Sequence, residues 1–76
     1  MNYGPINIDP ETMGGIPVFT ETRVPIQALF DYIESGETLN EFLENFPTVR
    51  KEFALQVLEM ARKTLTTEKI LNENFA

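Results

Sequence analysis

The side chains that could perform acid–base or metal chemistry in this chain of 76 residues are mostly carboxylates, because the sequence has 12 Asp and Glu residues but no histidine and no cysteine. Histidine is the usual general base and zinc ligand, and thiolates are the other common zinc ligands. Glu34, Glu37, Glu41 and Glu44 fall on the polar faces of predicted helices, where no apolar surroundings would raise a carboxyl pKa. We therefore expect solvated acids, with no catalytic residue and no metal site.

A nucleotide-binding loop is not indicated either. Gly14-Gly15 lacks the Gly-Lys-Ser/Thr of a P-loop and the glycine spacing of a dinucleotide-binding loop. The hydroxyl side chains have no histidine to act as their base, and they stand mainly at predicted helix caps. The sequence therefore disfavours an enzyme and predicts no cofactor.

The basic residues are concentrated in the last third of the chain, although the net charge is −6. Residues 1–49 contain eight acids and a single base, Arg23, whereas residues 50–76 contain five of the six bases. An overall charge of this sign disfavours non-specific nucleic-acid binding. The C-terminal bases are either solvated on helix surfaces or form a local contact surface.

A chain of this length folds as one domain with a small core, for which a second copy or a bound partner is a common remedy. No apolar run approaches the roughly 20 residues that span a bilayer, and the N-terminus lacks the features of a signal peptide. We expect a cytoplasmic protein without membrane contact. It should contain an arm over residues 1–24, a helical domain over 25–65 and a tail over 66–76.

The arm shows short strand-like segments and no helical period. Ile6-Asn7-Ile8 alternates apolar and polar residues, as a half-buried strand does. Asp9-Pro10 suits the first two positions of a type I turn, and residues 16–19 indicate a second strand. Pro17 cannot donate a backbone hydrogen bond, so the second strand should lie at a sheet edge.

The first two predicted helices cover residues 25–35 and 39–46. Gly36 suits the left-handed position that ends the first helix. Thr38 and Glu41 match the T-x-x-E capping box that begins the second. Together with a third helix, their apolar stripes should bring four aromatic side chains into one cluster: Phe30, Phe42, Phe46 and Phe53.

A third helix is predicted over about residues 49–64, with Thr48 as its N-cap, after a short turn at Pro47. A short helix, a turn and a longer helix match a helix-turn-helix, with the first helix as support. The start of the last helix enters the major groove in that motif, which makes Thr48, Arg50 and Lys51 candidates for DNA contact. Alternatively, any three-helix bundle has this shape, and these side chains simply face water.

The third helix also carries a second apolar stripe. Leu55 and Leu58 lie off the face that should meet the core, with Lys51 and Arg62 at the ends of their stripe. They need cover from the arm, from a second subunit or from another protein. We expect a homodimer, and the candidate interface residues are Val18, Phe19, Arg23, Val24, Leu55, Leu58 and Arg62.

The order of these motifs resembles a small bacterial family, domain of unknown function 433, over about residues 6–63. The resemblance is carried by a Gly-Gly-x-Pro-Val arm, a Thr-Arg-Val-Pro segment, a helix that ends in glycine, and a helix that ends before proline. Glu21 stands where the family often has glycine, and Arg50 stands near a position that is often Thr. The matching residues are Gly15, Pro17, Thr22, Arg23, Gly36 and Pro47.

The resemblance implies a homeodomain-like helix-turn-helix fold and the role of an antitoxin in a type II toxin–antitoxin system. Such an antitoxin would bind a PIN-like ribonuclease toxin and could repress its own promoter. In this interpretation the arm is an assembly device whose edge strands pair with a second chain. Arg23 should anchor the arm to a helix end or to an acidic side chain; alternatively, it contacts the toxin or DNA directly. The alternative is a regulatory or protein-interaction module without a toxin.

Overall fold

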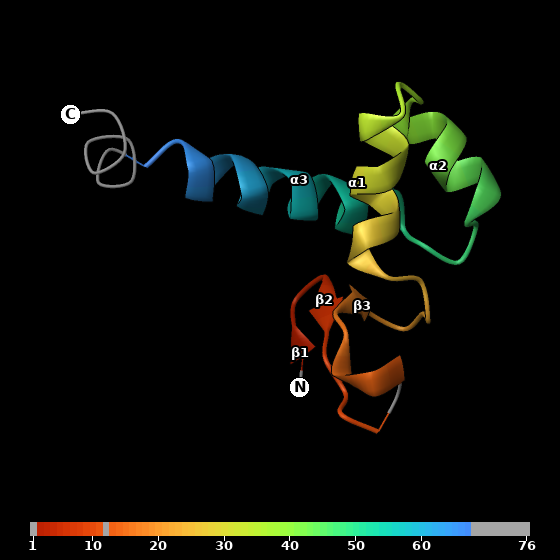
Figure 1. Ribbon diagram of the computed structural model, residues 1–76, viewed down its shortest axis with the longest axis vertical. Coiled ribbons are helices and arrows are strands. Elements are labelled where there is room, and N and C mark those ends of the chain that lie inside the picture. The colour runs from red at the N-terminus through yellow and green to blue at the C-terminus, as the bar shows by residue number, and fades with distance from the viewer. Residues whose placement is uncertain (1, 12, 68–76) are drawn as a thin grey trace.

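The computed structural model of the protein describes residues 2–11 and 13–67. It is mostly α-helical, with a small sheet at the N-terminus and three helices after it (Figure 1). The predicted fold class is therefore confirmed. The elements are β1 (Asn2–Tyr3), β2 (Ile6–Asn7), the short 3-10 segment η1 (Met13–Gly15), β3 (Val18–Phe19), α1 (Ile26–Glu34), α2 (Leu39–Asn45) and α3 (Lys51–Leu65).

The arm forms a three-stranded antiparallel sheet in the order β1-β2-β3. Ile6 of β2 lies opposite Tyr3 on one side and opposite Phe19 on the other. The two strands expected from the sequence correspond to β2 and β3, and β3 lies at an edge as Pro17 predicted. β1 was not predicted, because Asn2-Tyr3 lacks the apolar–polar–apolar alternation that marks Ile6-Asn7-Ile8.

The outer side of β3 is already occupied by the chain itself. The Phe19 amide donates a hydrogen bond to the Val24 carbonyl (2.9 Å), and the Ile26 amide donates to the Pro17 carbonyl (3.0 Å). These bonds close the segment before α1 against the strand. The expectation that this edge offers free backbone groups to a second chain is therefore wrong for β3, because the next segment of the same chain uses them.

The local signals for the first two helices are confirmed to within a residue or two. Gly36 has a φ of 85°, the left-handed backbone that ends α1. The capping box is complete: the Glu41 amide donates to Thr38 Oγ1 (3.1 Å), and the Thr38 amide donates to Glu41 Oε1 (2.9 Å). α2 ends at Asn45, and Phe46 leaves the helical region before Pro47.

The start of α3 differs from the prediction. Thr48 is not its N-cap, because the helix begins at Lys51 and Arg50 occupies the cap position without a side-chain cap. The Val49 amide donates instead to the Phe46 carbonyl (3.0 Å), which turns the chain and buries the Val49 side chain in the core. Residues 46–50 therefore separate α2 from α3, a longer connection than the turn expected for a helix-turn-helix.

The core lies where the sheet, α1, α2 and the first half of α3 meet. The ring centres of Phe42 and Phe46 lie 5.0 Å apart, and the Tyr32 ring stands nearly perpendicular to both, with its centre at 5.4 and 5.7 Å from theirs. Phe19 of the arm joins the same group, 5.9 Å from Phe42. Three of the four predicted aromatics, Phe30, Phe46 and Phe53, are only half-buried against this core. The buried residues of the core cluster are Phe19, Leu29, Phe42, Val49, Ala54 and Val57.

The C-terminal half of α3 extends beyond the sheet and the other two helices (Figure 1). Leu65, the last residue of α3, is 66% exposed as a result. The prediction of a separate tail concerns mainly residues 68–76, which lie outside the described residues.

Candidate interaction surfaces

Thr22 organises the turn that leads from the sheet to α1. Its hydroxyl donates to the Phe19 carbonyl (2.8 Å) and accepts from the Val24 amide (3.0 Å), while its own amide also donates to Phe19 (3.0 Å). A threonine hydroxyl that satisfies nearby backbone groups in this way stabilises a turn. The Thr-Arg-Val-Pro segment is therefore built around Thr22, and it leaves the Arg23 side chain exposed.

A second threonine fastens this turn to the beginning of the chain. Thr20 Oγ1 donates to the Gly4 carbonyl (2.6 Å), and the Thr20 amide donates to the Pro5 carbonyl (2.9 Å). The sequence contained no signal for this long-range pair. The hydrogen bonds hold the β1–β2 hairpin next to the turn that presents Glu21 and Arg23.

Glu21 occupies the left-handed backbone region with a φ of 66°, and it is the one described residue other than glycine with a positive φ. A residue with a Cβ atom fits this region less well than glycine does. The Glu21 carboxylate lies 3.3 Å from Arg50 Nη2, and both side chains are exposed. This ion pair links the arm to the start of α3.

The three predicted DNA-contact residues lie close to this link. Arg50 is paired with Glu21, and its guanidinium also lies over the Phe53 ring at 5.5 Å from the ring centre. Thr48 and Lys51 are exposed. The described structure therefore leaves two of the three free to face a partner, while Arg50 already has an acidic neighbour.

A shallow polar depression brings the arm and the α2–α3 connection together. Its volume is about 590 Å³, and its lining residues are Asn7, Glu21, Thr22, Arg23, Val24 and Thr48. Arg23 makes no ion pair with any residue in 2–11 or 13–67. The expectation that Arg23 anchors the arm is therefore wrong for the described chain, because Glu21 and Arg50 make that link.

Two of the predicted interface residues are buried in the chain's own core. Val18 is 4% exposed and Phe19 is fully buried. The reason is that the sheet folds onto the helices, so that Phe19 packs against Phe42 rather than facing outward. As folded, these two side chains are not available to a partner. Val24 and Leu58 are also partly buried against the core.

The exposed apolar side chains of α3 lie on its outward sides. Leu55, Met60 and Leu65 are 47%, 42% and 66% exposed. Leu55 is not covered by the arm, contrary to one of the possibilities that the sequence left open. Leu55, Leu58 and Leu65 follow one another at spacings of three and seven residues, which places them along one side of the helix. Large exposed apolar groups that lie along one element are typical of a protein-binding surface.

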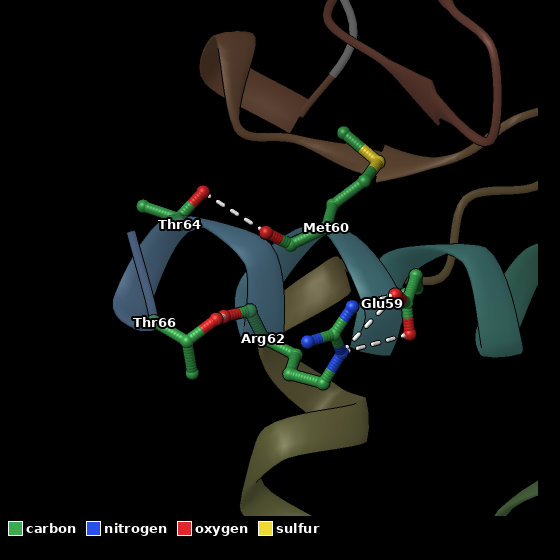
Figure 2. A network of polar contacts seen from close by, with 5 residues as sticks. All are labelled: Glu59, Met60, Arg62, Thr64 and Thr66. Atoms are coloured by element: carbon green, nitrogen blue, oxygen red, sulfur yellow. Dashed lines mark hydrogen bonds and ion pairs between the residues drawn. The ribbon is translucent and has the colours of Figure 1, made fainter. Parts of the chain in front are cut away.

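Arg62, the last of the predicted interface residues, pairs with Glu59 on the same helix. Arg62 Nε donates to both carboxylate oxygens of Glu59 (3.1 and 3.2 Å), and Nη2 contacts one of them as well. The hydrogen bond from Arg62 lowers the pKa of Glu59, and the same bond raises the pKa of Arg62. Figure 2 shows this pair on one side of α3 and Met60 pointing away from it. The pair therefore interrupts the apolar side chains with a polar contact.

A second depression, mainly apolar, lies between the arm and the beginning of α1. Its volume is about 660 Å³. One exposed side chain of the arm, Ile16, contributes to it together with half-buried Phe30. The complete lining is Ile16, Pro17, Pro25, Ile26, Gln27, Ala28, Phe30 and Asp31.

Among the described residues, no group of three or more His, Cys, Asp and Glu side chains is arranged to hold a metal ion. No helix in the part of the chain that the structure describes is long and apolar enough to cross a membrane. The surfaces that remain as candidates are the polar depression at Arg23, the apolar depression at Ile16 and the exposed side of α3.

No curated protein and no solved structure matches the chain. The family model described as "Protein of unknown function (DUF433)" matches residues 6–61. The matched segment begins at β2 and ends within α3, so that it contains the arm apart from β1 and the β1–β2 turn, the polar depression and all but the end of the helical domain. The chain is a member of the DUF433 family.

Proposed function

We propose that this chain is the antitoxin of a type II toxin–antitoxin pair, acting in the cytoplasm by binding and neutralising a PIN-like ribonuclease. The observation that carries the proposal is the exposed apolar side of α3, where Leu55 and Leu65 lie outside the chain's own core and Leu58 between them is only partly buried. A module whose only task is to bind another protein needs such a surface and needs no catalytic group.

The charge of the domain supports the same partner. The exposed acids of α1, α2 and the connection between them form no ion pair with any described base. The two ion pairs among the described residues are Glu21–Arg50 and Glu59–Arg62. A ribonuclease needs basic side chains to bind its polyanionic substrate. An acidic protein that docks beside these side chains is attracted by them and competes with RNA. The acids in question are Asp31, Glu34, Glu37, Glu41 and Glu44.

The test is co-expression with the protein encoded by the neighbouring reading frame. If that protein is a toxin, its expression alone should stop growth, and this chain should restore growth and co-purify with it. Leu55→Glu combined with Leu65→Glu should abolish both effects, because a charge is placed on each exposed leucine. The matched control adds the same charge at two other exposed α3 positions, Gln56→Glu and Thr64→Glu, and should still restore growth. Failure of the parent chain to restore growth or to co-purify would favour an interaction module without a toxin.

The same α3 surface supports a homodimer. The core is small, and Leu55 and Leu65 are exposed along one side of α3; both features favour pairing with a second copy. Light scattering at high micromolar concentration should give a dimer mass, and Leu55→Glu should shift it to that of a monomer. A monomer mass for the parent chain would exclude the dimer.

A second role, repression of its own promoter, is favoured by the depression that Arg23 and Thr48 both line, since Thr48 lies in the connection just before α3. In a dimer, two such surfaces spaced by about 34–36 Å would match one turn of DNA. Changing Arg50 and Lys51 together to Ala should weaken promoter binding and lower its salt slope by about two units. Promoter titrations at several salt concentrations, with and without the toxin, provide the measurement. Equal binding by the double variant and the parent would exclude this surface as the DNA contact.

A further inference from the structure

The polar depression next to Arg23 differs in character from the other exposed surfaces. None of the large exposed apolar side chains of the described residues contributes to its lining, in which Val24 is the one apolar residue beside five polar or charged ones. Protein interfaces contain an apolar centre, whereas contacts to a phosphate backbone use guanidinium, hydroxyl and amide groups. Arg23, Thr48 and Asn7 supply these three kinds of donor from three separate segments of the chain.

Glu21 is an unusual residue to find in this depression. A left-handed backbone costs free energy for every residue with a side chain, and glycine would adopt it without that cost. Strain of this kind is a reason to look for a role of the side chain. The Glu21 side chain places a carboxylate against Arg50, at the edge of the depression that Arg23 also lines.

We propose that this depression binds a phosphate of a nucleic-acid backbone through Arg23 and Thr48, and that Glu21 restrains this binding by occupying Arg50. The inference rests on the proposed DNA contact and adds two features to it: Arg23 as a phosphate ligand and Glu21 as an internal competitor. When a phosphate approaches, Arg50 can exchange the carboxylate for a phosphate oxygen, since both are anionic acceptors of the same guanidinium hydrogen bonds.

The size of the restraint follows from the exposure of the pair. The Glu21 and Arg50 side chains are 66% and 59% exposed, and an ion pair in such a position contributes little because water and salt screen it. Removing the carboxylate should therefore raise the affinity for DNA by no more than about fivefold. Release of Arg50 adds about one phosphate contact, which should make the salt slope steeper by about one unit.

The experiment measures fluorescence anisotropy of a labelled promoter duplex, and of a random duplex, between about 50 and 200 mM salt. Glu21→Gln removes the charge and keeps a side chain at the left-handed position. Its matched control is Glu34→Gln, which makes the same change of net charge at an exposed position on α1. Arg23→Gln tests the phosphate ligand, and Glu21→Gln in an Arg50→Gln background tests whether the gain passes through Arg50.

Glu21→Gln should bind both duplexes more tightly than Glu34→Gln, with the steeper slope, and this gain should disappear in the Arg50→Gln background. Arg23→Gln should weaken binding and make the slope shallower by about one unit. If the parent binds DNA but Glu21→Gln behaves like Glu34→Gln, or Arg23→Gln like the parent, the DNA contact stands and this inference is wrong. Absence of duplex binding by the parent and by Glu21→Gln would overturn both the proposed DNA contact and this inference. A labelled polyglutamate peptide that binds as tightly as the duplex would overturn the assignment to phosphate.

Discussion

Replacing Glu21 by glycine and by alanine separates the backbone strain at this position from the ion pair that the side chain makes. Both substitutions remove the pair with Arg50, but only glycine relieves the left-handed backbone, whose φ is 66°. The difference between the two variants therefore reports the backbone alone. The two variants thus test the turn of the arm that holds a non-glycine residue in the left-handed region.

The expected magnitude is a balance of two backbone effects. A residue with a Cβ atom in the left-handed region costs about 1–2 kcal/mol. Glycine avoids this cost, but it also makes the unfolded chain more flexible, which offsets about 0.4–1 kcal/mol of the gain in stability. The glycine variant should thus be more stable than the alanine variant by about 1 kcal/mol, or about 4–8 °C in melting temperature for a domain of this size.

The ion pair decides where the two variants lie relative to the parent chain. Both Glu21 and Arg50 are exposed, so the loss of their pair should cost no more than about 1 kcal/mol. The alanine variant should therefore be slightly less stable than the parent, and the glycine variant should be equal to it or more stable. Arg50→Ala removes the same pair and the contact with the Phe53 ring, so its loss should equal or exceed that of Glu21→Ala.

Thermal unfolding followed by circular dichroism measures these differences, and urea unfolding gives the corresponding free energies. The two variants of Glu21 should unfold with the same denaturant slope, since neither changes the buried surface. Alanine at position 21 as stable as glycine would show that the turn does not need a left-handed residue, and the reasoning about Glu21 would be refuted.

Three further predictions concern the packing, the capping and the acid sensitivity of the domain. Phe42→Ala should lower the free energy of unfolding by about 3–5 kcal/mol, because the ring is fully buried between Phe19, Tyr32 and Phe46; an unchanged melting temperature would contradict this core. Thr38→Ala should cost about 1 kcal/mol through loss of the capping box, whereas the exposed Ser35→Ala should have little effect on melting temperature. Acid should destabilise the fold through Glu41, whose pKa is lowered below its ordinary value mainly by the hydrogen bond that its carboxylate accepts from the Thr38 amide. A lowered folded pKa adds stability above the ordinary carboxyl pKa, and this is lost as the pH falls through the folded value. Glu41→Gln should therefore show a smaller fall in melting temperature on acidification than the parent, and an equal fall would exclude this contribution.

Several elements follow from residues that act within a few positions of one another. Gly36 ends α1, the pair of Thr38 and Glu41 begins α2, and Pro47 excludes Phe46 from the helix. Each of these effects depends on local backbone geometry and on hydrogen bonds between near neighbours. Pro17, from which an edge strand was predicted, directly precedes β3 at the edge of the sheet. The mostly helical class and the approximate helix bounds could therefore be predicted from the sequence.

The candidate surfaces depended on contacts between distant segments, and here the predictions were less accurate. The periodicity of the arm could not show that Phe19 would pack on Phe42, so Val18 and Phe19 were assigned to a partner surface. Likewise, the exposed bases looked equivalent in the sequence. The fold distinguishes them, because it places Glu21 against Arg50 and leaves Arg23 without an ion-pair partner among the described residues.

The sequence by itself determined the helical class, the capping signals, the edge position of β3, the absence of histidine and cysteine and the membership suggested by the arm motifs. Only the tertiary structure decided the start of α3, where burial of Val49 outweighs the capping preference of Thr48. It also decided which bases are paired and which apolar side chains of α3 remain exposed. The physical reason is that capping and turn preferences act over a few bonds, whereas burial and ion pairing depend on which distant segments the folded chain brings into contact.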